Sequence, residues 1–315
     1  MNKLSKRDCL LLAIMIGILT SSIYIYAAKL GGMNSSDFRY SINIASDWLA
    51  GKDPYIPYHT VQYPPIVAYP FTAAVLSIPF IKLPFPIAEW IFAGLGSALL
   101  AWLILSRSKP WLLLILLSWP FINSLIFGQW VTYAISLFFT SSMLPVLLVK
   151  PQIALPFVLT KKPNLTGLLL ASFLLILSIV LYPKWPLDWI KLIQSYGGYP
   201  LLFVIPLGPI ILLSLIRYKD KRSWLLVLLS AMPQRMVYDQ LGVLLIAEDK
   251  KQLIFLILCS WISFPALLYF HGWDNMPWGW KTWVFLESYL PALIVVLLPT
   301  IVGLKNKVWK PGVAT

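Results

Sequence analysis

Residues 110–149 contain no Asp, Glu, Lys or Arg over forty consecutive positions. A helix rises 1.5 Å per residue, so a hydrocarbon core about 30 Å thick is crossed by about 20 apolar residues. The run is long enough for two membrane-spanning helices, and the polar pair Gly128-Gln129 marks the break between them. The chain is 59% hydrophobic and 12% charged, whereas a soluble domain has about 25% charged residues. We therefore predict an all-α, polytopic transmembrane bundle.

Basic residues cluster between the apolar runs, and such clusters mark the cytoplasmic side of a membrane protein. Lys6 and Arg7 precede the first run, and Lys305 and Lys307 follow the core of the last, so we expect both termini in the cytoplasm. The net charge of +13 then has a simple cause, and nucleic acid is not an expected partner. Residues 1–315 are predicted to form one integral-membrane domain. Its eight expected spans are 9–28, 86–105, two within 110–149, 164–182, 199–216, 253–270 and 286–304.

Three further apolar segments are too short or too polar to cross completely. They are residues 66–81, residues 144–160 with Lys150 at a break, and residues 223–247, which contain Arg235 and Asp239. We expect shallow or re-entrant pieces there, the last two entering from the cytoplasmic side. Non-helical backbone at membrane depth persists only where it is buried in protein or lines a cavity. Ionisable side chains at such depth mark function by default.

The first loop, residues 29–65, is expected on the extracytoplasmic side. Apolar and aromatic residues recur there at helical spacing from Phe38 to Leu49, and Gly51 follows. This pattern predicts an amphipathic helix on the membrane surface that ends before Gly51. Asp37 stands at its start. It is either a catalytic base at the membrane face or, with Ser36, an ordinary helix cap.

Metal and cofactor chemistry have no sequence support. His59 and His271 are far apart, and Cys9 and Cys259 both fall inside apolar runs. No P-loop, no Gly-rich dinucleotide motif and no HExxH motif is present. We therefore expect no metal and no other cofactor, although Asp37 and Asp53 together could hold a metal ion.

Six short motifs follow one another along residues 30–245. They are Asp37-Phe38…Tyr40, Gly51…Asp53-Pro54-Tyr55, Tyr63-Pro64-Pro65, Gly128-Gln129, Lys150-Pro151-Gln152 and Pro233…Tyr238-Asp239. Their order resembles glycosyltransferase family 87, which belongs to the GT-C structural class of membrane transferases.

The resemblance implies a fold, a reaction and a site. It implies a GT-C bundle in the plasma (inner) membrane that transfers a sugar, mannose or another hexose or pentose, from a polyprenyl-phosphate donor. The acceptor would be a glycan or glycolipid on the extracytoplasmic side. It also implies Asp37 as the catalytic base. The expected substrate-binding residues are Arg39, Tyr40, Asp53, Tyr55, Tyr63, Gln129, Lys150, Arg235 and Asp239.

The charges suit this chemistry but leave alternatives open. A carboxylate can take the proton of an attacking hydroxyl, and a cation can hold the phosphate that leaves. Lys150 could instead snorkel to the cytoplasmic interface, and Arg235 could simply pair with Asp239. The rival functions are a transporter or flippase of lipid-linked sugars and a non-catalytic membrane scaffold.

Overall fold

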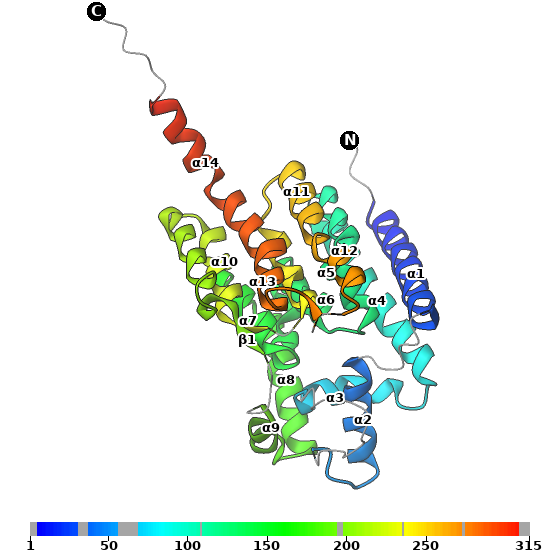
Figure 1. The fold of residues 1–315 in the computed structure, drawn as a ribbon. Coiled ribbons are helices and arrows are strands. Elements are labelled where there is room, and N and C mark those ends of the chain that lie inside the picture. Colours follow the sequence, from blue (N-terminus) through cyan, green and yellow to red (C-terminus); the bar gives the residue numbers. More distant parts are fainter. Residues whose placement is uncertain are drawn as a thin grey trace, which may run out of the picture. The chain divides into compact units, whose positions relative to one another are not determined.

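The structure is a computed structural model, and apart from its one small sheet the regular structure that it describes is helical (Figure 1). The sheet joins two short strands, β1 (Tyr199–Pro200) and β2 (Pro233–Gln234). This confirms the predicted all-α class. The described residues are 5–30, 37–55, 69–107, 109–193, 198–234, 236–272 and 275–308.

The chain divides into two compact units. Unit 1 comprises residues 1–199 and 234–241, and unit 2 comprises residues 200–233 and 242–315. The chain thus leaves unit 1 once and returns to it for a short segment. Each unit is described by itself below.

Two long helices of unit 1 lie side by side, α1 (Lys6–Leu30) and α4 (Phe85–Arg107) (Figure 1). Glycines allow their backbones to approach closely. A Cβ atom on Gly17 would lie 2.6 Å from the carbonyl oxygen of Gly94, closer than real Cβ contacts come. The helices predicted over 9–28 and 86–105 are confirmed.

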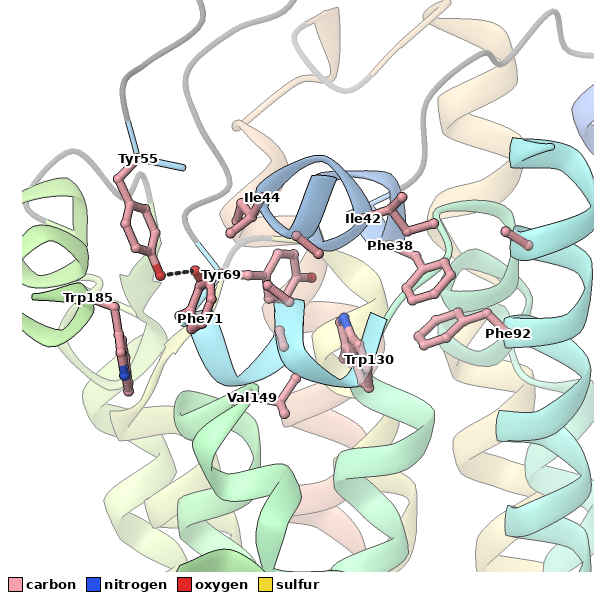
Figure 2. Close-up of a cluster of buried hydrophobic side chains, with 14 residues drawn as sticks. Phe38, Ile42, Ile44, Tyr55, Tyr69, Phe71, Phe92, Trp130, Val149 and Trp185 are labelled. Atoms are coloured by element: carbon pink, nitrogen blue, oxygen red, sulfur yellow. Dashed lines mark hydrogen bonds between the residues drawn. The ribbon is translucent and has the colours of Figure 1, made fainter. Parts of the chain in front are cut away.

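The predicted surface helix is α2 (Asp37–Leu49), and the chain turns at Gly51 with a φ of 70°. Its apolar face is buried over α4 and α3 (Phe71–Ser77), as Figure 2 shows. The rings of Phe38 and Phe92 stack with centroids 3.8 Å apart. Because aromatic burial is the dominant apolar contribution in such a cluster, this contact fixes the start of α2 on α4.

Residues 110–149 differ from the expected pair of unbroken spans. Each of Pro110, Pro120 and Pro145 lacks a backbone donor. Pro110 and Pro120 stand in the first turn of a new helix, and Pro145 lies inside one. Gly128, with a φ of 54°, separates two of the pieces as predicted. The pieces are η2 (Pro110–Leu117), α5 (Trp119–Ile126), α6 (Val131–Ile135), η3 (Ser136–Phe138) and η4 (Ser141–Leu148).

The predicted break at Lys150 is confirmed, since Lys150 stands between η4 and α7 (Pro151–Thr160). Helix α8 (Leu165–Leu181) follows, and α9 (Trp185–Ile193) continues from it after a bend of 98°. The segment 66–81, predicted to be a shallow piece, contains α3 and the short turn η1 (Ile78–Phe80).

Unit 2 is also helical. The span expected at 199–216 is interrupted, because it holds the single turn η5 (Leu201–Phe203) and, after a break, the helix η6 (Gly208–Arg217). The two short pieces expected within 223–247 are α10 (Lys221–Ala231) and η7 (Val237–Ile246), the latter beginning in unit 1. The remaining elements are α11 (Lys250–Ser260), α12 (Ser263–Tyr269), α13 (Trp280–Val284), the π-helix η9 (Phe285–Tyr289) and α14 (Leu290–Val308).

Within the described residues, three helical stretches are long and apolar enough to cross a membrane. They are Phe85–Arg107, Lys250–Tyr269 and Trp280–Pro299, and the bent pair α8 and α9 makes a fourth if it is counted as one span. Their length and composition indicate a membrane protein.

Candidate functional site

Asp37 is the first residue of α2, and its position is fixed from two sides. Its backbone N–H donates to the carbonyl oxygen of Phe127 at 2.8 Å, in the turn between α5 and α6. The neighbouring Phe38 anchors α2 on α4 through its stack on Phe92. A carboxylate at a helix N-terminus is also favoured by the helix dipole. The half-buried Asp37 side chain is therefore held beside the Gly128-Gln129 break.

Tyr69 joins Asp37 to that break, and the sequence reasoning missed it. Its hydroxyl lies 3.4 Å from Oδ2 of Asp37 and 3.4 Å from Oε1 of Gln129. The Tyr55 hydroxyl donates to the main-chain carbonyl of Tyr69 at 3.2 Å, as the dashed line in Figure 2 shows. The signal in the sequence was the repetition of a Tyr-Pro pair, Tyr63-Pro64 and then Tyr69-Pro70.

Gln129 leads directly to a buried ion pair. Nζ of Lys150 donates to Oε1 of Gln129 at 2.8 Å and lies 2.8 Å from Oδ1 of Asp239. The ammonium also stands over the ring of Tyr238, 4.9 Å from its centroid. Gln129, Lys150 and Asp239 are 2%, 3% and 1% exposed. A buried pair of this kind persists because each charge has a partner and further hydrogen bonds.

This geometry corrects two expectations and leaves a third untested. Lys150 does not snorkel to an interface, because its side chain is buried on Asp239 and Gln129. Asp239 pairs with Lys150, and the expected pairing of Arg235 with Asp239 stays a prediction, because Arg235 lies outside the described residues. Lys150 and Asp239 were expected at tips on the cytoplasmic side, apart from Asp37 and Gln129, but unit 1 brings them together. The reason is that the helices around these positions are short, so their ends meet inside the unit.

Arg39 is engaged in a structural contact. Its Nε and Nη2 atoms both lie 2.9 Å from Oε1 of Glu89, and its guanidinium stands 4.6 Å from the centroid of the Phe85 ring. The Glu89 carboxylate is buried on α4, so the pair ties α2 to that helix. Arg39 therefore reinforces the anchor that Phe38 makes beside it.

The remaining predicted binding residues take structural positions or fall outside the described ranges. Tyr40 is half-buried against the aromatic core. The exposed Asp53 accepts the backbone N–H of Tyr55 at 2.9 Å, which is an Asx-turn. Burial raises the pKa of Tyr55, whose ring stacks on Tyr182. Tyr63 lies outside the described residues, so its expected contact with substrate stays a prediction.

No family model, curated protein or solved structure matches this chain. Its function must therefore be argued from its own residues and their geometry. The feature to be explained is a continuous series of polar side chains inside the largely apolar unit 1, called the polar track below. The track runs from Asp37 through Tyr69 and Gln129 to the Lys150–Asp239 pair.

The track holds groups of complementary chemistry but no evident metal site. In the part of the chain that the structure describes, no three His, Cys, Asp or Glu side chains gather as a ligand set. One end of the track is a half-buried carboxylate and the other is a buried cation with its counter-ion. Such a set can accept a proton at one end and hold an anion at the other.

Proposed function

We propose that this chain is an integral-membrane glycosyltransferase of GT-C type. It would transfer a sugar, mannose or another hexose or pentose, from a polyprenyl-phosphate donor to a glycan or glycolipid acceptor on the extracytoplasmic side. The observation that carries the proposal is the hydrogen-bonded track that links Asp37 to the buried Lys150 within unit 1. The order of the six motifs supports it independently.

Asp37 is the proposed general base. A sugar hydroxyl is a weak nucleophile until it loses its proton, and a carboxylate within hydrogen-bond reach can take that proton. The acceptor oxygen forms its bond to C1 of the donor sugar while the bond from C1 to the phosphate oxygen breaks. The proton ends on Asp37, and a single displacement of this kind inverts the anomeric centre. General-base catalysis of this kind is worth about 10²–10⁴ in rate.

Lys150 is the proposed partner of the leaving phosphate. Polyprenyl phosphate leaves as an anion, so it requires stabilisation of its charge rather than a general acid. A fixed ammonium in a low-dielectric site interacts strongly with phosphate oxygens. Lys150 is held between Gln129 and Asp239. A bound phosphate would take the place of the Asp239 carboxylate as the anionic partner of Lys150. Arg235 would add a second cation.

The proposed arrangement in the membrane keeps eight crossings, with those in 110–149 and 199–216 made by broken helices, and it has cytoplasmic termini and loop 29–65 outside. The stretches Phe85–Arg107, Lys250–Tyr269 and Trp280–Pro299 are long and apolar enough for three of these spans, and α1 would supply a fourth. Basic clusters in the sequence support the orientation. The proposed location is the plasma (inner) membrane, where a polyprenyl-phosphate donor would be available from the lipid phase.

A transporter or flippase of lipid-linked sugars is the second candidate. Short helices that end at a buried ion pair also occur at the substrate sites of transporters. Lys150, which precedes α7, and Asp239, in the first turn of η7, favour this alternative. It does not account for a carboxylate anchored at the start of a surface helix.

The test uses purified protein in nanodiscs with polyprenyl-phosphate-linked sugars and a panel of glycan acceptors. Wild type is compared with Asp37→Asn for release of free polyprenyl phosphate, and Asp47→Asn on the same helix is the matched control. We expect release by wild type and by Asp47→Asn, and a loss of at least about 100-fold in Asp37→Asn with lipid binding retained.

Equal release by wild type and Asp37→Asn would remove Asp37 from the chemistry. If no donor is cleaved, the protein is moved to liposomes that carry a fluorescent polyprenyl-phosphate sugar in one leaflet. Protein-dependent movement of that lipid between leaflets would then replace the transferase with the transporter.

A further inference from the structure

We propose that Tyr69 is a positioning residue that sets the protonation equilibrium of Asp37 and couples it to the buried Lys150–Asp239 pair. The inference deepens the proposed function, on which it depends for the role of Asp37 as base. The observation behind it is the position of the Tyr69 hydroxyl between two acceptors. One is the carboxylate of Asp37, and the other is the Gln129 oxygen that also accepts from Lys150.

The Tyr69 hydroxyl has one proton and two acceptors at equal distance. Oδ2 of Asp37 and Oε1 of Gln129 both lie 3.4 Å from its oxygen. The residue is 4% exposed, and its main-chain carbonyl is held by the Tyr55 hydroxyl. The backbone of Tyr69 is thus held and its side chain is buried, while the hydroxyl proton can point to either acceptor.

Each direction of donation has a different consequence for Asp37. A hydrogen bond to the ionised carboxylate favours that form, so donation to Oδ2 keeps Asp37 deprotonated and ready to act as a base. Donation to Gln129 withdraws that support. Oε1 of Gln129 already accepts from Nζ of Lys150 at 2.8 Å, so any change at Lys150 alters how strongly Gln129 competes for the Tyr69 proton.

The charged neighbours of Asp37 do not change when the Tyr69 hydroxyl is removed. On α2 and α4, Arg39 and Glu89 are paired with each other. Helix α3 and the turn η1 contain no ionisable residue, and the α5–α6 connection contributes the neutral Gln129. Beyond Gln129 stands the Lys150–Asp239 pair. Tyr69→Phe thus removes one neutral donor and leaves the surrounding charges as they are.

The test measures the titration of Asp37 without relying on turnover. Infrared difference spectra of the full chain in lipid bilayers are recorded across pH, and the band of the protonated Asp37 carboxyl is assigned by its loss in Asp37→Asn. We expect Tyr69→Phe to move the midpoint of this band upward by about one pH unit, the equivalent of one charge-assisted hydrogen bond. Tyr133→Phe is the matched control, because the hydroxyl of this half-buried residue donates to the carbonyl of Phe92 at 2.7 Å instead.

An unchanged midpoint in Tyr69→Phe, or the same shift in Tyr133→Phe, would overturn the inference. Where wild type turns over, the acidic limb of the rate profile should move with the band in Tyr69→Phe. A fault in folding alone would lower the rate at all pH values. A wild type without turnover contradicts the proposed function, and the infrared titration still decides whether Tyr69 controls Asp37.

Discussion

Lys150 and Asp239 form an ion pair with Nζ and Oδ1 2.8 Å apart, and both side chains are almost completely buried. They belong to unit 1, but the chain passes through residues 200–233 of unit 2 between them. The pair therefore fixes the returning segment 234–241 on the rest of unit 1. It also creates an energetic liability, because removal of either residue would leave the other charge buried without its opposite charge in this pair.

The first prediction concerns this pair. Lys150→Met should destabilise the protein by about 3–5 kcal/mol, because it leaves the Asp239 carboxylate buried without its cation. The double variant Lys150→Met with Asp239→Leu should recover most of that loss, since it removes both charges. Thermal unfolding in nanodiscs measures both. A double variant as unstable as Lys150→Met would contradict the prediction, because the loss would then not come from the unpaired Asp239 charge.

A second prediction concerns Glu287 in the π-helix of unit 2. Its side chain is 0% exposed, and its carboxylate accepts the backbone N–H of Ser263 at 3.3 Å. Among the described residues it forms no ion pair, and an unpaired buried charge is very costly. We therefore expect Glu287→Gln, which keeps the shape without a charge, to change the free energy of unfolding by less than about 1 kcal/mol.

Thermal unfolding of Glu287→Gln checks this, and Glu248→Gln on an exposed turn is the control. A loss of several kcal/mol in Glu287→Gln alone would mean that Glu287 is charged and paired.

The third prediction is a pH dependence at Asp220, in the turn between η6 and α10. Burial raises the pKa of this carboxyl, but the hydrogen bonds and charges of Arg222 and Arg217 outweigh burial and hold it below its usual value. A folded-state pKa below the unfolded value means that the stabilisation is complete above the unfolded pKa near 4. It is lost as the pH falls through the lower, folded-state value.

Asp220→Asn should therefore lower the unfolding temperature at pH 7 and flatten its dependence on pH below about 4. The measurement is the unfolding temperature of both proteins across this range, with Asp47→Asn as a control. Parallel curves for wild type and Asp220→Asn would contradict the prediction.

Local features of this chain could be predicted from the sequence because their causes are local. Spacing and a glycine determine α2, and the break at Lys150 follows from the Pro151 that begins the next helix. The proline breaks within 110–149 were underestimated, since hydropathy alone does not distinguish an unbroken span from several short helices.

The convergence of the site was not predictable in this way. Asp37, Gln129 and Lys150 lie far apart in sequence, and positive-inside counting placed two of them on opposite sides. Tyr69 was missed because a Tyr-Pro pair, even when repeated, has many structural uses. Only the packing of short helix ends in unit 1 shows that these residues share one hydrogen-bonded track.

The insertion of residues 200–233 between the two parts of unit 1 also has a consequence for biosynthesis. A ribosome adds about 5–20 residues per second, so Lys150 is made roughly 5 to 20 seconds before Asp239 is available to pair with it. During that interval its ammonium must stay in water or find a temporary partner. A nascent chain that stops before Asp239 would lack the carboxylate that pairs with the Lys150 ammonium. The state of this pair therefore differs between finished and unfinished protein, and cellular quality control could use that difference.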